Sequence, residues 1–178
     1  DTTSPTASCQ NITVYLDGAG NATITAADID NGSTDNCTTV SLSTDITAFT
    51  CANIGANTVT LTVTDGSSNT STCTSTVTIA DTTSPTASCQ NITVFLDGTG
   101  NATITAADID NGSTDNCTTV SLATDITTFT CADVGTKTVT LTATDGSSNT
   151  ATCTSTVTVW DTTSPTASCQ NITVYLDG

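Results

Sequence analysis

Several residue types are missing from this sequence. It contains no His and no Met, and Lys137 is its only basic residue. Against that single base stand seventeen acidic residues, all of them Asp, for a formal net charge of −16. A chain of this charge repels phosphate groups, which excludes nucleic acid and anionic membrane as partners. Without His or a second basic group, catalysis by Ser–His, Cys–His or Lys lacks its activating residue, so we expect no enzyme activity.

Long apolar segments are missing as well. No run of about eighteen apolar residues exists, so no segment is expected to span a membrane. No basic stretch precedes an apolar one, so we identify no signal peptide. The sequence begins without Met and stops just after a strand-like run. We therefore interpret it as an interior segment of a longer polypeptide.

An 80-residue repeat organises the chain. Residues 1–80 and 81–160 align without a gap and differ at twelve positions, and 161–178 repeat 1–18 without a change. A unit of this length can bury a core of its own. We expect domains at 1–80 and 81–160, followed at 161–178 by a linker and the first strand of a third repeat. Near-identical tandem domains serve to extend a protein or to bind through many copies more often than they serve catalysis.

Each repeat has the pattern of an all-β domain. Apolar and polar residues alternate strictly at 58–64 and 74–79, which places Val59, Leu61 and Val63 on one face of a strand and Thr on the other. Thr is β-branched and tolerates water, so it suits a solvated face. Shorter runs at 8–16, 22–25 and 40–49 predict further strands, and 26–29 predicts a single helical turn. Turn residues occupy 17–21 and 65–69. We therefore predict tandem immunoglobulin-like Greek-key β-sandwiches.

Cysteine spacing favours disulfides. The chain has nine Cys, four in each repeat and Cys169 in the partial third. Four cysteines allow three connectivities, which spacing cannot distinguish. Wide spacing without a CxxC pair argues against zinc, and the lack of His argues against a catalytic thiol. Disulfides place the chain in an oxidising compartment, outside the cell or on its surface. Cys169 is expected to pair with a residue beyond the sequence.

Several motifs together resemble the hyalin-repeat (HYR) family. They are Asp-Thr-Thr-Ser-Pro-Thr at 1–6, Cys9, Asn-Ile-Thr-Val at 11–14, Thr-Asp-Asn-Cys at 34–37 and the run from Thr64 to Cys73. The chain is also similar to tandem repeats of very long secreted proteins of Bacteroidetes-type bacteria. The resemblance implies an immunoglobulin-like sandwich in an extracellular adhesive or structural array, without enzyme activity. Because family members with two cysteines keep the first and last, it also implies the pairs Cys9–Cys73, Cys37–Cys51, Cys89–Cys153 and Cys117–Cys131.

The Asp residues are expected to gather at one pole of each sandwich. Loop positions on the predicted fold bring together Asp1, Asp28, Asp30, Asp35 and Asp65, and in the second repeat Asp81, Asp108, Asp110, Asp115 and Asp145, with Asp161 opening the third. Across each junction, the preceding repeat offers Asp17 or Asp97, together with Asn21 and Asn53. Such a cluster suits Ca²⁺, which takes six to eight oxygen ligands, so we predict an interdomain calcium site that stiffens the linker. The alternative is that these residues cap turns and keep the protein soluble.

Two smaller signals complete the sequence interpretation. Asp-Thr-Thr resembles an acceptor motif for Bacteroidetes O-glycosylation, which makes Thr2, Thr82 and Thr162 weak candidates. The six aromatic residues mostly occupy core-like positions, so a binding module for glycans or another cell ranks second. The leading prediction is a structural protein forming an extracellular filament or cell-surface stalk. Its partners would be neighbouring repeats and other copies of the chain.

Overall fold

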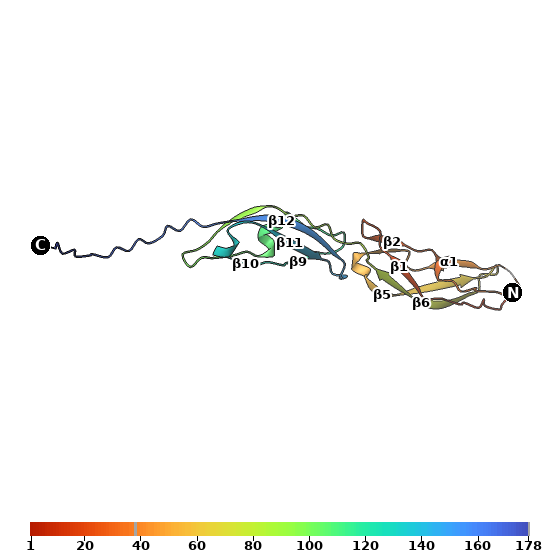
Figure 1. Cartoon of the computed structure of the whole chain (residues 1–178). Helices are drawn as coiled ribbons and strands as arrows, with labels where there is room; N and C mark the ends of the chain where they lie inside the picture. The colour runs from red at the N-terminus through yellow and green to blue at the C-terminus, as the bar shows by residue number, and fades with distance from the viewer. Residues whose placement is uncertain (38, 178) are drawn as a thin grey trace.

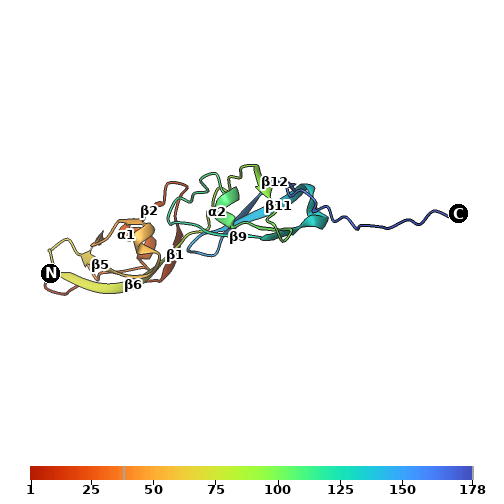
Figure 2. The ribbon, with the colours of Figure 1, turned by 90° about the vertical axis from the view of Figure 1, so that its left-hand side faces the viewer.

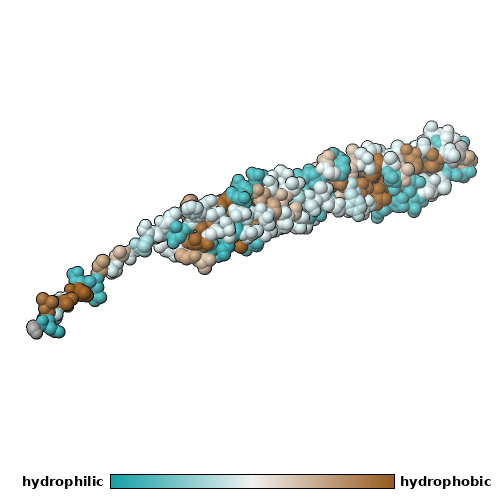
Figure 3. Space-filling view, turned by 45° about the horizontal axis from the view of Figure 1, so that its top comes forward, coloured by the Kyte–Doolittle hydropathy of each residue, from teal (hydrophilic) through white to brown (hydrophobic). Residues whose placement is uncertain are grey.

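Two β-sandwiches lie end to end in an elongated particle (Figures 1 and 2). The computed structural model describes residues 1–37 and 39–177. The N- and C-termini lie at opposite ends of the particle, and residues 161–177 leave the second sandwich as an extended chain without strand pairing. The surface in Figure 3 is largely white to teal, with scattered brown apolar patches. Among the described residues, no helix is long and apolar enough to cross a membrane.

Both sandwiches contain the same elements in the same order. The elements of the first are β1 (Ile12–Tyr15), β2 (Asn21–Thr23), α1 (Ala26–Ile29), β3 (Ser41–Thr44), β4 (Ala48–Thr50), η1 (Cys51–Asn53), β5 (Gly55–Thr64) and β6 (Thr70–Ala80). The elements of the second are β7 (Ile92–Phe95), β8 (Asn101–Thr103), α2 (Ala106–Ile109), β9 (Ser121–Thr124), β10 (Thr128–Thr130), η2 (Cys131–Asp133), β11 (Gly135–Thr144) and β12 (Thr150–Trp160).

Each repeat consists of a four-stranded sheet and a two-stranded sheet. The first repeat has the orders β1-β6-β5-β3 and β2-β4, and the second has β7-β12-β11-β9 and β10-β8. The first strand runs parallel to the last, and every other pair is antiparallel. The first four strands alternate between the two sheets, so the chain crosses repeatedly from one layer to the other. The predicted all-β, immunoglobulin-like Greek-key sandwich is confirmed.

The core follows from the alternation in the two long strands. Val59, Leu61 and Val63 of β5 are fully buried, as predicted, and Val77 and Ile79 of β6 lie beside them in the same cluster. Phe49 of β4 closes this cluster from the second sheet, and the second repeat repeats the arrangement around Phe129. Burial of these side chains supplies the main favourable free energy of folding.

The predicted strand at 40–49 divides into two strands of different sheets. At the bend, Asp45 Oδ1 accepts a hydrogen bond from the backbone N of Thr60 at 2.9 Å, and Asp45 N donates to Thr60 O at 3.3 Å. The hydrogen bond to the Asp45 carboxylate fixes the end of β3 against β5, and the chain then leaves this sheet and starts β4. The single helical turn at 26–29 is present as predicted.

Most of the aromatic residues are not in the core, so that sequence expectation is wrong. Phe49 and Phe129 are buried, but Tyr15, Phe95 and Trp160 are 61%, 59% and 55% exposed. The cause is the two-residue period of the outer strands. In β1 and β7 the alternation turns the Val inward, so the next residue, Tyr15 or Phe95, faces solvent.

The first and last cysteines of each repeat form the disulfides that the family resemblance implied. Cys9 bonds Cys73 with a Cα–Cα distance of 5.9 Å, and Cys89 bonds Cys153 at 5.8 Å. Each bond ties the segment before the first strand to the last strand of the same sandwich. The chain-entropy relation gives about 4 kcal/mol for closing a loop of this length.

Acid is expected to weaken the sandwich through the bend residue Asp45. The backbone N–H of Thr60 holds the pKa of Asp45 below its usual value of 3.8. A carboxyl whose pKa is lower in the folded than in the unfolded state stabilises the fold above the unfolded pKa, and this contribution disappears as the pH falls through the folded pKa. We expect the melting temperature of the wild type to fall more steeply below about pH 4 than that of Asp45→Asn.

The matched control for this measurement is Asp177→Asn, which removes one charge from the extended tail. Its melting temperature should follow that of the wild type at every pH. Parallel curves for the wild type and Asp45→Asn would contradict the role assigned to this carboxylate.

Candidate metal centre at the domain junction

The two sandwiches are joined by a disulfide between repeats. Cys51, at the start of η1, bonds Cys117, in the loop between α2 and β9, with a Cα–Cα distance of 5.1 Å. The pairs Cys37–Cys51 and Cys117–Cys131, which the family resemblance implied, are therefore wrong. Cys37, Cys131 and Cys169 have no disulfide partner among the described residues.

Strand length explains why the implied pairs cannot form. Cys51 precedes the start of β5, whereas Cys37 follows Asp35, which lies beside Asp65 just past the end of that strand. Ten residues of extended chain span roughly 33 Å, and a disulfide requires Cα atoms within about 7 Å. The two cysteines thus occupy opposite ends of one sandwich, and each can meet only a neighbouring repeat.

Gly20 allows the bridge to pack against the end of the first sandwich. Its φ is +77°, a conformation that favours glycine, and a Cβ at this position would collide with Cys51 Sγ. Cys51 Sγ lies 3.6 Å from the carbonyl oxygens of Gly20 and Asn116. The turn that follows β1 therefore forms one wall of the junction.

Asn116 adds a polar contact across the junction. Its Nδ2 donates to the backbone O of Asp17 at 3.2 Å, which orients the amide. Its Oδ1 is buried and has no hydrogen-bond partner in the described chain. Burying an unpaired acceptor is costly, so this oxygen can still accept a hydrogen bond or coordinate a cation.

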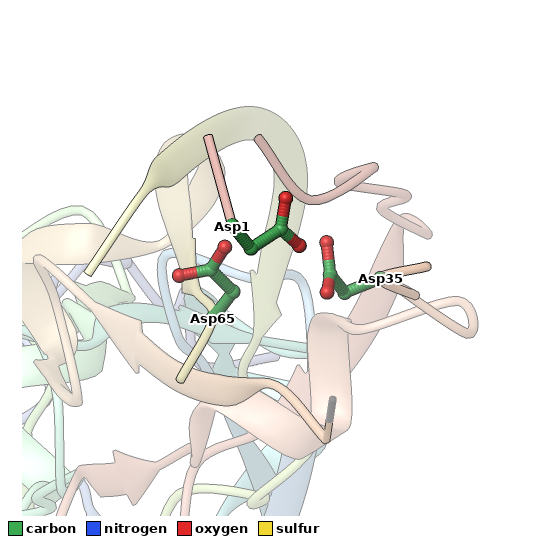
Figure 4. A group of neighbouring side chains, drawn as sticks. All are labelled: Asp1, Asp35 and Asp65. Carbon is green, nitrogen blue, oxygen red and sulfur yellow. The ribbon is translucent and has the colours of Figure 1, made fainter. Parts of the chain in front are cut away.

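Three carboxylates meet in each repeat, and those of the second repeat include Asp115, the neighbour of Asn116. One oxygen each of Asp81, Asp115 and Asp145 lies within 4.8 Å of the others, and Asp1, Asp35 and Asp65 form the same group in the first repeat. Figure 4 shows the side chains of Asp1, Asp35 and Asp65 pointing toward one another from three separate segments. These are the chain start, the loop before β3 and the turn after β5.

The two groups differ in the burial of one member. Asp81 is only 7% exposed, whereas Asp1, which has the same position in the first repeat, is exposed. Asp65 and Asp145 are equally buried, at 6% and 7% exposure. The difference between Asp1 and Asp81 arises because a preceding sandwich covers Asp81. Three carboxylates partly removed from water repel one another unless a cation or protons compensate.

Backbone groups fix two of these carboxylates in place. Asp145 Oδ1 accepts from the backbone N of Ser147 and Asn149 at 2.9 and 2.8 Å, and its Oδ2 accepts from Asn149 Nδ2 at 2.8 Å. Asp81 Oδ1 accepts from Thr83 N at 3.0 Å. These bonds leave lone pairs of both carboxylates available to a further ligand.

The two carboxylate oxygens of Asp115 differ in their hydrogen bonding. Its Oδ2 accepts from the backbone N of Cys117 and Thr118 at 2.9 and 3.2 Å. Its Oδ1 is buried without a hydrogen-bond partner in the described chain. Ca²⁺ prefers carboxylate and amide oxygens, and the three clustered carboxylates supply the first kind. Asn116, which follows Asp115 in sequence, carries a buried amide oxygen without a hydrogen-bond partner in the described chain. The residues present therefore fit a hard cation.

The other predicted acids lie outside these groups, which corrects the expectation of five carboxylates at one pole. Asp28 Oδ2 accepts from Thr25 N at 2.7 Å at the start of α1, and this bond lowers the pKa of Asp28. Asp30 accepts from Ser33 and Gly32, and its pKa is lowered chiefly by the Ser33 hydroxyl. Asp108 and Asp110 repeat these roles. Asp30 is thus held in its own turn with Gly32 and Ser33, where Gly32 has a φ of +79°, and does not join Asp35 in the carboxylate group.

The residues expected across the junction contribute little to the group. Asp17 and Asp97 cap their own turns, and Asp17 reaches the next repeat only through its backbone oxygen. Asn21 donates to Ala19 O, and Asn53 Oδ1 accepts from Thr50 N. Asp161 accepts from Thr163 N in the tail. Asn116, in contrast, was not predicted, although its motif was visible in the sequence.

Comparison with known proteins adds only a general likeness of fold. The titin I-band fragment I67–I69 is 10% identical, with a TM-score of 0.44 over 90% of this chain and 67% of that one. Mouse cadherin-23 EC22–24 is 14% identical, with a TM-score of 0.43 over 90% of this chain and 65% of that one. Protocadherin gamma B7 domains 1–4 are also 14% identical, with a TM-score of 0.38 over 89% of this chain, which spans about half of that fragment (51%). No protein-family model matches the sequence, and no curated protein is significantly similar to it.

Gly20→Ala is expected to disrupt the junction. The added Cβ would meet Cys51 Sγ and force a positive φ on a residue that resists it, so the Cys51–Cys117 bond should form incompletely. Mass spectrometry of peptides under non-reducing conditions measures the bonded fraction. Gly18→Ala, in the same turn with no atom within 4 Å of its Cβ, is the matched control and should bond fully. Equal bonded fractions in the two variants would contradict the proposed close approach.

Proposed function

We propose that the chain is part of an extracellular rod, built from tandem immunoglobulin-like domains of the HYR-like type at 1–80 and 81–160. The observation that carries this proposal is the Cys51–Cys117 bond. A peptide linker and a disulfide together connect the two sandwiches at two points. A joint held at two points resists bending, which suits a filament or stalk that transmits force or extends reach.

The composition supports the same function. Thr on the outward faces and a formal charge of −16 keep a long array soluble without a large apolar surface. Disulfides within and between repeats require an oxidising compartment, which supports a location outside the cell or on its surface. With no His and a single Lys, the chain offers no activated nucleophile, so we propose that it is not an enzyme.

Calcium is the cofactor that we propose for the junction. Asp81, Asp115 and Asp145 would hold it, with the amide oxygen of Asn116 as a further candidate ligand. The ion would neutralise repulsion among the carboxylates and connect the linker to two loops of the second sandwich. The joint would then be held by a disulfide, a peptide linker and an ion.

Exposed aromatic residues favour adhesion as a second candidate function. Phe95 and Trp160 are cross-strand partners on β7 and β12, and both are more than half exposed. Tyr15 of the first repeat is 61% exposed although a second sandwich follows it, so this face stays accessible within an array. Aromatic side chains of this kind are common in binding surfaces, including those for glycans. Thr2, Thr82 and Thr162 are also exposed and remain candidate glycosylation sites.

Removing the disulfide between the repeats should make the joint flexible. In the double variant Cys51→Ser, Cys117→Ser, only the linker and non-covalent contacts hold the two sandwiches. We expect small-angle scattering and electron microscopy to show a broader distribution of interdomain angles and a smaller average maximum dimension. Cys169→Ser removes an exposed thiol from the tail and should leave the particle shape unchanged. An unchanged angular distribution in the double variant would contradict the mechanical role of the bond.

Calcium should stabilise the wild type through the junction carboxylates. A ligand that binds only the folded state at a hundred times its Kd adds about 2.7 kcal/mol to the free energy of unfolding. We expect EDTA to lower the melting temperature and to shorten or kink the particle. Asp115→Asn, Asp145→Asn should reduce the calcium stoichiometry measured by calorimetry by one site.

The matched control is Asp108→Asn, Asp110→Asn, which removes the same charge from the same sandwich outside the carboxylate group. It should keep the wild-type stoichiometry. Identical melting curves and particle dimensions in calcium and in EDTA would exclude the ion from the junction.

A further inference from the structure

The four-stranded sheet of the second repeat has an outer face without carboxylates. Its strands β7, β9, β11 and β12 contain no Asp, and their one charged residue, Lys137, forms an ion pair with Asp133 at 3.0 Å. The outward residues of β11 and β12 are threonines that pair across the strands, as Thr136 does with Thr158 and Thr138 with Thr156. In a chain with a formal charge of −16, this face is a surface of different chemistry.

The paired threonines present hydroxyl groups at a regular spacing. Cross-strand neighbours lie about 5 Å apart, and successive outward residues of one strand lie roughly 7 Å apart. A hydroxyl group both donates and accepts hydrogen bonds, as the hydroxyl groups of a sugar do. A cationic ligand, in contrast, would find no carboxylate on these four strands. The face therefore suits a ligand that is uncharged and rich in hydroxyl groups.

An aromatic pair ends this face. Phe95 of β7 and Trp160 of β12 are cross-strand partners, and both are more than half exposed. The residues before them, Val94 and Val159, pack in the core, so alternation places both aromatic side chains on the outer face. The apolar C–H face of a sugar ring packs against aromatic rings exposed in this way.

A shallow hollow lies on the same two strands. Its volume is about 200 Å³, and it is lined by Asn91, Ile92, Thr93, Thr156 and Thr158. Asn91 Oδ1 accepts from the backbone N of Thr156 at 2.8 Å, which fixes the amide and leaves its Nδ2 as a donor at the hollow. Hydrogen-bonding groups thus lie along β7 and β12 next to the aromatic pair.

Differences between the repeats concentrate at this end of the sheet. The first repeat has Tyr15 and Ala80 where the second has Phe95 and Trp160, the only Trp of the chain. Seven of the twelve differing positions lie on or beside the ends of β7, β11 and β12, namely Phe95, Asp133, Val134, Thr136, Lys137, Val159 and Trp160. Tyr15 is 61% exposed with a sandwich following it, so a neighbouring domain leaves this position open.

We propose that the second repeat binds a neutral polysaccharide on an aromatic face formed by Phe95, Trp160, Asn91, Thr93, Thr156 and Thr158. Two sugar rings pack on Phe95 and Trp160, and the hydroxyl groups of the following rings exchange hydrogen bonds with the threonines and Asn91. The net charge of −16 repels anionic polysaccharides, which restricts the ligand to neutral ones. The inference rests on adhesion, the second candidate function, and adds to it a ligand class and a site in one repeat.

Fluorescence of the single Trp tests the proposal directly. Glucose, xylose and mannose hexasaccharides are titrated separately into the 178-residue chain, with an oligogalacturonate as the anionic counterpart. We expect at least one neutral hexasaccharide, and not the anionic one, to shift the Trp160 emission to shorter wavelength with one site per chain. Phe95→Ala should raise the Kd roughly tenfold or more, as for other aromatic residues at the centre of a binding surface. Thr156→Val, Thr158→Val should raise it as well.

The first repeat supplies the matched controls. Tyr15→Ala removes an equally exposed aromatic residue at the position of Phe95 and should leave the Kd unchanged. Ala80→Trp gives the first repeat the missing partner of Tyr15 and should raise the stoichiometry measured by calorimetry from one site to two. Melting temperatures close to that of the wild type verify that the variants are folded.

Three results would overturn the proposal. One is the absence of an emission shift with all three neutral hexasaccharides. Another is an emission shift without sugar that grows with protein concentration, accompanies dimers in sedimentation and disappears in Phe95→Ala, since the face would then bind a second copy of the chain. The third is sugar binding in calorimetry that Phe95→Ala and Trp160→Ala leave unchanged, which would retain adhesion as a function but remove this site.

Discussion

The Cys51–Cys117 bond is the interaction on which the particle depends. Each sandwich has its own core and its own disulfide, and Cys117 of the second repeat is packed against the core of the first. The interdomain bond joins the two sandwiches where Asn116 contacts Asp17 and where Asp81 is buried. The disulfide, the Asn116–Asp17 hydrogen bond and the buried Asp81 therefore all belong to one junction.

Burial gives the carboxylate group its chemical meaning. In the first group Asp1 is exposed, Asp35 is half-buried and Asp65 is buried. In the second group Asp81 is buried as well, and Asp115 and the adjacent Asn116 each carry a buried oxygen without a hydrogen-bond partner among the described residues. If calcium binds as proposed, ion binding and domain alignment would stabilise each other.

The two near-identical repeats form near-identical contacts. They differ at only twelve positions, so most hydrogen bonds within one sandwich recur in the other. At one pair of positions, both repeats form a side-chain contact although the residues differ. Asn57 Nδ2 donates to Asn53 O at 2.7 Å in the first repeat, whereas Lys137 and Asp133 form an ion pair at 3.0 Å in the second. This pair is partly exposed, so it replaces a local contact without adding much stability.

The sequence by itself determined the features that depend on local pattern. Strict alternation in 58–64 and 74–79 identified the buried faces, and the repeat length separated the two sandwiches, because strand periodicity and core size act within one domain. Only the tertiary structure decided which cysteines and which acids meet. Cys51 and Cys37 lie close in sequence but at opposite ends of a strand, and Asp28 and Asp30 are drawn into a helix cap and a turn away from Asp35. Both outcomes depend on distances through space along a folded sandwich, which sequence spacing does not measure.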